Sequence, residues 1–377
     1  MAFDVEDNVF MIPGPVKIHP RVLRAMCKPS MGHRSPEFKA VNKEIRELTQ
    51  YLFQTNYDVA VLTGSGTAAM DAGINNLVHP GDRIVSMFNG KFGERLADIA
   101  DVYSKNVTRI EAPWGRLEDL ERLKKELEKG DVKLVTLVHN ETSSGFCHPI
   151  EKIAKIVKKH DALLLADCIT SAACLEVKPD EWGIDVTIAG SQKGIAAPAG
   201  LSMLAISPRA LEAMHNESSY YLDLKKHVKK FKSDDTPYTP AIHLFLAYRE
   251  ALRILKEEGI ENRISRVENI ANACRSAIKA IGLELLAQDP YHSNTVTAIK
   301  KPDGVEIKEL RSQLKNLGVV VAGAQAPHKG EFFRIGHMGQ VDIKELASTI
   351  TALEVCLGKL GYKLDNGAGV AAIERFM

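Results

Sequence analysis

Between residues 36 and 260, short apolar runs alternate with amphipathic stretches. The runs are continuously apolar, which is typical of strands buried on both faces of a sheet. They are Val59–Leu62, Ile84–Phe88, Lys133–Val138, Ala162–Ala166, Val186–Ala189 and Leu201–Ile206. Helical patterns such as Leu117–Leu127 and Ile150–His160 lie between them. This alternation predicts an α/β fold with a mostly parallel sheet flanked by helices.

The pattern changes after about residue 258. Long helical patterns and half-exposed strands follow, which together predict a smaller α+β domain. The helical patterns are Ala241–Glu258, Ile264–Ile281, 306–317 and 342–360, and the strands are Thr295–Ile299 and Phe332–Ile335. We therefore expect an N-terminal arm (1–19), a large domain (20–258) and a small C-terminal domain (259–377). Gly259 is the expected helix C-cap at the boundary.

Composition and charge narrow the function classes. The 377 residues are 45% hydrophobic and 26% charged, an ordinary globular composition. The net charge of +1 gives no global field toward nucleic acid or an anionic membrane. Six cysteines without a C-x-x-C pair indicate free thiols and no metal site. The acidic start and the lack of an 18-residue apolar stretch predict a cytoplasmic protein.

The segment Thr63–Thr67, with the sequence Thr-Gly-Ser-Gly-Thr, follows one predicted strand and opens a helix. Small residues there let backbone N–H groups face an anion, which predicts a phosphate cradle. A tight turn capped by Ser65 or Thr67 is the plainer alternative. The glycine spacing also fits a dinucleotide fingerprint, but the next strand ends in Asn89-Gly90 without the acidic residue that binds a ribose. A single phosphate therefore fits better.

Two further residues follow strand ends. Asp167 closes a buried strand and faces the edge where α/β sheets bind ligands, although a turn or cap acid is the alternative. Lys193 lies in Gly190–Gly194 among small and apolar residues, a poor context for an ordinary surface lysine. A buried lysine has a lowered pKa and can serve as a nucleophile or base. Together with a phosphate cradle, these are the groups that pyridoxal phosphate requires.

With these features in place, the chain resembles class V, fold-type I aminotransferases, near the alanine–glyoxylate, serine–pyruvate and archaeal broad-specificity aspartate enzymes. Each motif is weak alone, but their order and spacing agree over nearly the whole chain. The motifs are Ile12–Val16, Thr63–Thr67, Asn89–Arg95, His139–Gly145, Asp167, Gly190–Lys193, Thr236–Pro240 and Phe333–Gly339. The resemblance implies a homodimer in which the two subunits share each active site.

The resemblance also implies roles for single residues. Lys193 would form an imine with the aldehyde of pyridoxal phosphate and then move the substrate's proton, and Asp167 would keep the pyridine nitrogen protonated. Phe92 would stack on the ring, and Thr142 would bind near its 3′ oxygen. The residues that would gather the phosphate are Ser65, Gly66, Thr67 and Gln192, joined by Tyr238 and Thr239 of the other subunit.

For the substrate, the resemblance assigns the α-carboxylate to Arg334 and places Pro13 and Gly14 beside it. Arg334 lies between apolar Phe333 and Ile335, so strand alternation puts it on the opposite face. Arg34 is a candidate for the distal carboxylate of aspartate or glutamate, with a local ion pair to Glu37 equally open. The implied reaction moves an amino group from alanine, serine or aspartate to glyoxylate, pyruvate or 2-oxoglutarate by a ping-pong mechanism.

The sequence leaves three alternative functions open. A nucleotide-dependent oxidoreductase would use the glycines of residues 64–66 but lacks the ribose acid. A non-catalytic scaffold that binds the cofactor has little use for a substrate arginine. A cysteine desulfurase or lyase would share the fold, but Gln192 precedes the lysine where desulfurases typically have histidine, and Cys274 and Cys356 fall within helical patterns.

Overall fold

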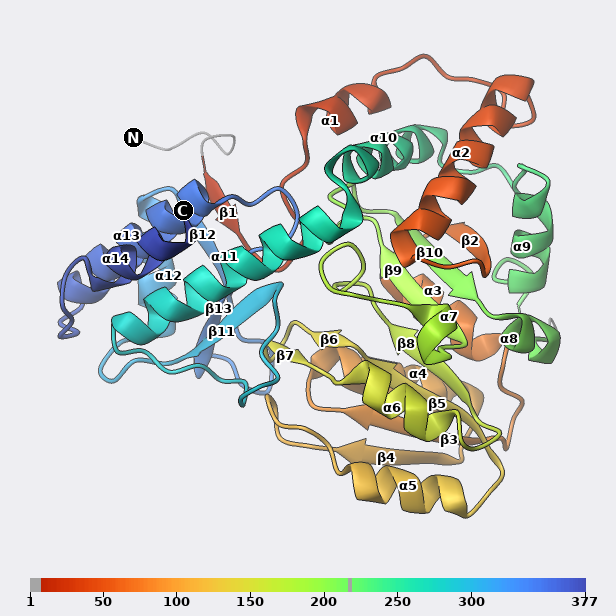
Figure 1. Cartoon of the computed structure of the whole chain (residues 1–377), viewed down its shortest axis with the longest axis horizontal. Coiled ribbons are helices and arrows are strands. Elements are labelled where there is room, and N and C mark those ends of the chain that lie inside the picture. The colour runs from red at the N-terminus through yellow and green to blue at the C-terminus, as the bar shows by residue number, and fades with distance from the viewer. Residues whose placement is uncertain (1–7, 216–218) are drawn as a thin grey trace.

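The computed structural model describes residues 8–215 and 219–377, which build a larger and a smaller sheet with helices packed around them (Figure 1). The larger sheet has seven strands. In spatial order they are β2 (Asp58–Thr63), β10 (Leu201–Ile206), β9 (Val186–Gly190), β8 (Leu163–Asp167), β5 (Val132–Val138), β3 (Arg83–Phe88) and β4 (Val107–Glu111). Only β10 runs antiparallel to its neighbours, so the predicted mostly parallel sheet is confirmed.

The strands of this sheet are buried on both faces, as their continuous apolar runs predicted. In β2, Val59 and Val61 pack in one cluster with the helices Pro36–Phe53 and Ile242–Glu258, whereas Ala60 and Leu62 pack in another with the helices Gly66–Asn75 and Lys91–Tyr103. Successive side chains of a strand point to opposite faces, so both layers of helices draw on the same run. The edge strand β4 was not predicted, because most of its residues are only partly buried and no apolar run marks it.

Helices surround the larger sheet, and none in the described ranges is both long and apolar enough to cross a membrane. In chain order they are α1 (Pro20–Met26), α2 (Pro36–Phe53), α3 (Gly66–Asn75), α4 (Lys91–Tyr103), α5 (Leu120–Glu128), α6 (Ile150–Val157), α7 (Pro179–Trp182), α8 (Pro208–Ala213), α9 (Leu224–Lys232) and α10 (Ile242–Glu258). A short hairpin, β6 (Asn140–Glu141) and β7 (Phe146–Cys147), follows β5.

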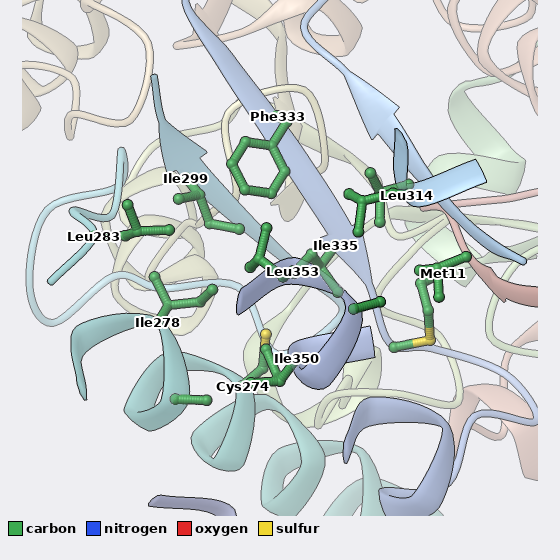
Figure 2. Packing of buried hydrophobic residues seen from close by; sticks show 14 of the residues in the cluster. Met11, Cys274, Ile278, Leu283, Ile299, Leu314, Phe333, Ile335, Ile350 and Leu353 are labelled. Atoms are coloured by element: carbon green, nitrogen blue, oxygen red, sulfur yellow. The ribbon is translucent and has the colours of Figure 1, made fainter. Parts of the chain in front are cut away.

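The smaller sheet combines one strand near the N-terminus with three strands from the C-terminal part of the chain. Its order is β1 (Val9–Met11), β12 (Val319–Gly323), β13 (Phe332–Gly336) and β11 (Val296–Lys300). The helices here are α11 (Ile260–Ala280), α12 (Ile307–Asn316), α13 (Ile343–Lys359) and α14 (Ala368–Ile373), with a final 3₁₀ turn at Glu374–Phe376. Figure 2 shows Phe333 and Ile335 of β13 packed against Ile350 and Leu353 of α13.

The predicted N-terminal arm is partly a strand. Val9–Met11 pairs in parallel with Val319–Val321, and Met11 is fully buried in the core of the smaller sheet. Residues 1–7 of the predicted arm lie outside the described residues. Anchoring β1 in this way fixes the course of Pro13 and Gly14, which follow it directly.

Gly259 joins α10 to α11, as the sequence predicted for a helix C-cap. Its φ is +83°, a conformation that favours glycine, and its N–H donates to the carbonyl of Leu255. From this glycine α11 runs across to the smaller sheet (Figure 1). We propose the domain boundary at this point.

Candidate active site

A cavity of about 200 Å³ opens at the carboxyl-terminal edge of the larger sheet. Ligands of parallel α/β sheets bind at this edge, because strand ends and helix starts converge there. The lining residues are Ser65, Gly66, Thr67, Met70, Phe92, Arg95, Val138, Asn140, Thr142, Asp167, Ile169, Thr170, Gln192 and Lys193. The structure therefore brings together the predicted residues from five segments of the chain.

One end of the cavity is the start of α3. Ser65 is the N-cap of this helix, but its side chain makes no capping hydrogen bond, so its hydroxyl and the N–H groups of the first turn remain available. Gly66 lets the helix start approach Ile169 closely, because an added Cβ would lie 2.4 Å from Cδ1 of Ile169 and the isoleucine would have to shift. The guanidinium of Arg95 donates to Oγ1 of Thr67 over 3.3 Å. A helix N-terminus beside an arginine favours an anion.

Asp167 ends β8 and is 4% exposed. Its Oδ1 accepts a hydrogen bond of 2.8 Å from the N–H of Ile169. Burial raises the pKa of Asp167 to about 7, and the nearby charge of Glu141 acts in the same direction. Without a ligand the carboxyl group is therefore costly to ionise, and a cationic partner in the cavity would relieve that cost.

Phe92 lies in the first turn of α4 and is partly buried where it lines the cavity. The guanidinium carbon of Arg95 lies 5.0 Å from the centre of its ring. This cation–π contact helps to fix the ring plane from the side of the helix. Phe92 and Asp167 thus supply an aromatic face and an acid to one cavity.

Lys193 follows β9 and projects into the cavity, where its Nζ donates to the carbonyl of Pro13 over 2.6 Å. The pKa of Lys193 is lowered to about 8, chiefly by burial, which outweighs the opposing charge of Asp167, and the positive charges of Arg334 and Arg95 contribute in the same direction as burial. This direction agrees with the one expected from its sequence context. Near neutral pH a usable fraction of this amine carries a free electron pair.

Gly14 lies against this lysine. Its φ is +95°, and an added Cβ would lie 2.6 Å from both Cδ and Nζ of Lys193. No side chain fits there without displacing the amine. Because β1 holds the preceding residues in the smaller sheet, this close approach couples the smaller sheet to the lysine.

Arg334 in β13 is 5% exposed and faces away from Phe333 and Ile335, which lie in the core of the smaller sheet. Its Nε and Nη2 donate to the carbonyl of Gly323, and its Nη1 donates to the carbonyl of Thr142 over 2.9 Å. Burial lowers the pKa of Arg334 to about 10. None of the carboxylates in residues 8–215 and 219–377 pairs with it, so a buried guanidinium remains available for an acidic ligand.

Besides Pro13, Gly14 and Arg334, which do not line the cavity but adjoin Lys193 or Thr142, three more predicted residues lie away from the cavity of their own chain. Arg34 pairs with Asp235 and donates to the carbonyl of Thr236 over 2.5 Å, so the expected local pair with Glu37 is replaced by a contact 201 residues away. The hydroxyl of Tyr238 donates to the carbonyl of Tyr220 over 2.6 Å, and Thr239 is exposed. Arg34 thereby fastens the loop that carries both of these residues.

Several residues of the site were not predicted from the sequence. Arg95 is one of them, although its spacing of three from Phe92 puts both on one helix face. Asn140 and Thr170 line the cavity and hydrogen-bond to each other, and the Nδ2 of Asn140 also donates to Oγ1 of Thr295 over 2.7 Å. Thr295 lies next to β11, so this network ties the cavity to the smaller sheet, and no local pattern marks it.

Comparison with known proteins places this geometry in a family. A family described as aminotransferase class-V matches residues 21–328. An uncharacterized aminotransferase of Methanocaldococcus jannaschii is 40% identical over 98% of each chain. The serine–glyoxylate aminotransferase of Arabidopsis thaliana is 36% identical over 97% of this chain and 94% of its own.

Solved structures agree. The ureidoglycine–glyoxylate aminotransferase of Bacillus subtilis superposes with a TM-score of 0.92 at 30% identity, covering 98% of this chain and 97% of its own. The family match covers the larger sheet and every residue that lines the cavity, and the relatives and the solved structure extend over both sheets. The chain belongs to the class V aminotransferases, with the fold-type I architecture that the motifs implied.

Proposed function

We propose that this enzyme uses pyridoxal phosphate to move the amino group of a small amino acid, namely alanine, serine or aspartate, to an oxo acid by a ping-pong mechanism. The observation that carries the proposal is Lys193, a half-buried amine with a pKa near 8 in the same cavity as Asp167 and the start of α3. A lysine, an acid and an anion site in one cavity match the aldehyde, the ring nitrogen and the phosphate of this cofactor.

The residues present fit that cofactor. Ser65 and the first turn of α3 offer uncapped donors for a phosphate. The Oε1 of Gln192 is a buried acceptor without a protein partner among the described residues, so its amide has no fixed orientation and is free to present its N–H₂ group to the same anion. Asp167, whose pKa is raised by burial, is suited to a cationic ring nitrogen. The cavity therefore contains donors where the cofactor is negative and an acid where it is positive.

When bound, pyridoxal phosphate supplies an electron sink for the electron pair released at the α-carbon of the substrate. Asp167 would hold the proton on the ring nitrogen that makes this sink effective. Lys193, with a pKa near the working pH, would take the α-proton as a base and return it as an acid. Phe92 would cover one face of the ring and keep water away, and Arg334 would orient the α-carboxylate by a two-point contact.

We propose a homodimer in which Tyr238 and Thr239 reach the phosphate of the partner subunit. The support is their position: Thr239 is exposed, and the loop is held by Arg34 and lies apart from the cavity of its own chain. Exposed Tyr220 and Tyr221 stack beside Tyr238, which leaves an apolar surface next to the loop. Sedimentation at several concentrations should give a dimer.

Glyoxylate is the acceptor we favour, because a relative and a solved structure with full-length similarity are both named for reactions with it. The decisive experiment incubates the purified holoenzyme with alanine, serine and aspartate against glyoxylate, pyruvate and 2-oxoglutarate. We expect amino transfer in the panel, with glyoxylate among the accepted oxo acids. Loss of a visible cofactor spectrum, or no reaction with any pair, would refute the proposal.

Replacing Arg334 with glutamine should raise the KM of every amino donor far more than it lowers kcat. Removing one partner of a buried charge pair costs about 2–5 kcal/mol, which corresponds to roughly 30-fold or more in kcat/KM. Steady-state kinetics with alanine and with serine measure this. Arg311, a neighbour whose Nε donates to the carbonyl of Val321, is the matched control, and Arg311→Gln should leave KM within about twofold.

Replacing Arg34 with alanine separates two roles for this residue. If Arg34 supports the loop of Tyr238 and Thr239, as its contacts with Asp235 and Thr236 indicate, the affinity for pyridoxal phosphate should fall by about 3- to 10-fold for all donors alike. If it binds a distal carboxylate across the dimer, the KM of aspartate should rise while that of alanine is unchanged. Cofactor titration and kinetics with both donors distinguish the two outcomes.

A further inference from the structure

Glu141 has no role in the proposed reaction, yet it is fully buried and makes four hydrogen bonds. Its Oε2 accepts from the N–H groups of Phe92 and Gly93 over 3.0 and 2.9 Å. Its Oε1 accepts from the N–H and the hydroxyl of Ser143 over 3.0 and 2.6 Å. A buried carboxylate whose two oxygens each accept from two donors is held rigidly.

These bonds replace a missing helix cap. The N-cap of α4 is Gly90, which has no side chain to bind the N–H groups of the first turn. Glu141 and Ser143 satisfy the N–H groups of Lys91, Phe92 and Gly93 from about 50 residues further along the chain. The positive end of the α4 dipole adds attraction for the carboxylate.

Gly90 allows this contact. An added Cβ would lie 2.4 Å from Cγ of Glu141 and 2.5 Å from Oγ of Ser143. The backbone at the start of α4 therefore lies closer to Glu141 and Ser143 than a residue with a side chain at position 90 would allow. The same first turn carries Phe92 and leads to Arg95, the aromatic face and the cation of the cavity.

We propose that Glu141 is a positioning residue: it caps α4 from the β6–β7 hairpin and thereby fixes Phe92 and Arg95 for binding of the cofactor ring and phosphate. This proposal rests on the proposed function. Its charge also faces the rest of the site, since Glu141 raises the pKa of both Asp167 and Arg334. One buried carboxylate thus connects the ring face, the ring acid and the substrate arginine.

The test uses the full-length cofactor-free protein titrated with pyridoxal phosphate, and it measures the dissociation constant and the visible circular dichroism of the bound ring. Glu141→Gln keeps the size of the side chain, but its amide turns an N–H₂ group toward donors that need an acceptor. We expect cofactor affinity to fall by about 10-fold and the dichroism of the ring to change. Ser143→Ala, a milder change in the same cap, should give a smaller shift in the same direction.

Glu354 offers a matched control. It is also a buried carboxylate that caps a helix, since its two oxygens accept from the N–H groups of Gly367 and Gly369 at the start of α14, in the smaller domain. Glu354→Gln should lower the melting temperature yet leave cofactor affinity within about twofold and the dichroism unchanged. Loss of affinity in both variants in proportion to their melting temperatures would overturn the positioning role.

A double-mutant cycle shows whether Glu141 acts through Phe92. If it does, the variant with both Glu141→Gln and Phe92→Leu should lose clearly less affinity than the two single losses combined, because the losses overlap at Phe92 while the effect through Arg95 remains. Additive losses would contradict the proposal, as would wild-type affinity in Glu141→Gln. A wild-type protein that does not bind pyridoxal phosphate would instead refute the proposed function, and this role with it.

Discussion

Replacing Lys193 with alanine is expected to abolish transamination, with kcat reduced on the order of 10⁴-fold or more. The change removes both the amine that joins the cofactor and the group that moves the α-proton, and general acid–base catalysis alone contributes about 10²–10⁴-fold. Mass spectrometry after borohydride reduction should show the cofactor attached at residue 193 in the wild type and no attachment in the variant. Single-turnover kinetics with alanine measures the loss.

The control for this prediction is Lys155→Ala, because Lys155 is exposed and pairs with Glu151 one turn before it. Its kcat should equal that of the wild type. A small primary amine added to Lys193→Ala should restore part of the activity, since it fits the space that the side chain leaves. Full activity in Lys193→Ala, or reductive attachment of the cofactor to another lysine, would overturn the assignment.

Asp167→Asn should lower kcat by roughly 10²–10³-fold, the usual effect of removing one fixed charge from an active site. An amide cannot stabilise a proton on the ring nitrogen, whereas its oxygen can still accept from the N–H of Ile169. The loss should therefore appear in kcat with little change in the folded structure. Steady-state kinetics at saturating cofactor measures it, and kcat within twofold of the wild type would contradict the role.

The same variant should stabilise the cofactor-free protein at alkaline pH. The pKa of Asp167 is raised to about 7 by burial, against about 4 when unfolded, so between these values the folded chain binds a proton that the unfolded chain has released. This group's contribution to stability therefore falls as the pH rises from about 4 to 7. We expect Asp167→Asn to melt a few degrees above the wild type at pH 8 and to match it near pH 4.

Lys193 shows the opposite dependence. Its pKa near 8 lies below the ordinary value, so above about pH 8 the unfolded chain binds the proton that the folded chain has lost, and stability rises with pH up to about 10. Near neutral pH, both Asp167 and Lys193 therefore lower the stability of the cofactor-free protein. Such sites sacrifice stability for function, and a bound cofactor that accepts both groups offsets the cost.

The sequence by itself determined six of the seven strands of the larger sheet and most of the residues that line the cavity. Buried parallel strands require continuous apolar runs, and the residues that follow such runs must converge on one edge of the sheet. Asp167, Lys193 and the start of α3 each follow a strand that the pattern located. They converge in one cavity because these strands end at the same edge of the sheet, and the apolar runs in the sequence show where each strand ends.

Only the tertiary structure decided which distant segments meet. The strand β1 is a short apolar run of three residues that pairs with β12, some 310 residues later, and this pairing sets Pro13 and Gly14 against Lys193. Arg34 was expected beside Glu37 or a substrate and pairs with Asp235 instead. Glu141 caps a helix that starts 50 residues before it. Periodicity records how one segment is buried, whereas these contacts depend on the packing of segments against one another, and no local pattern encodes that.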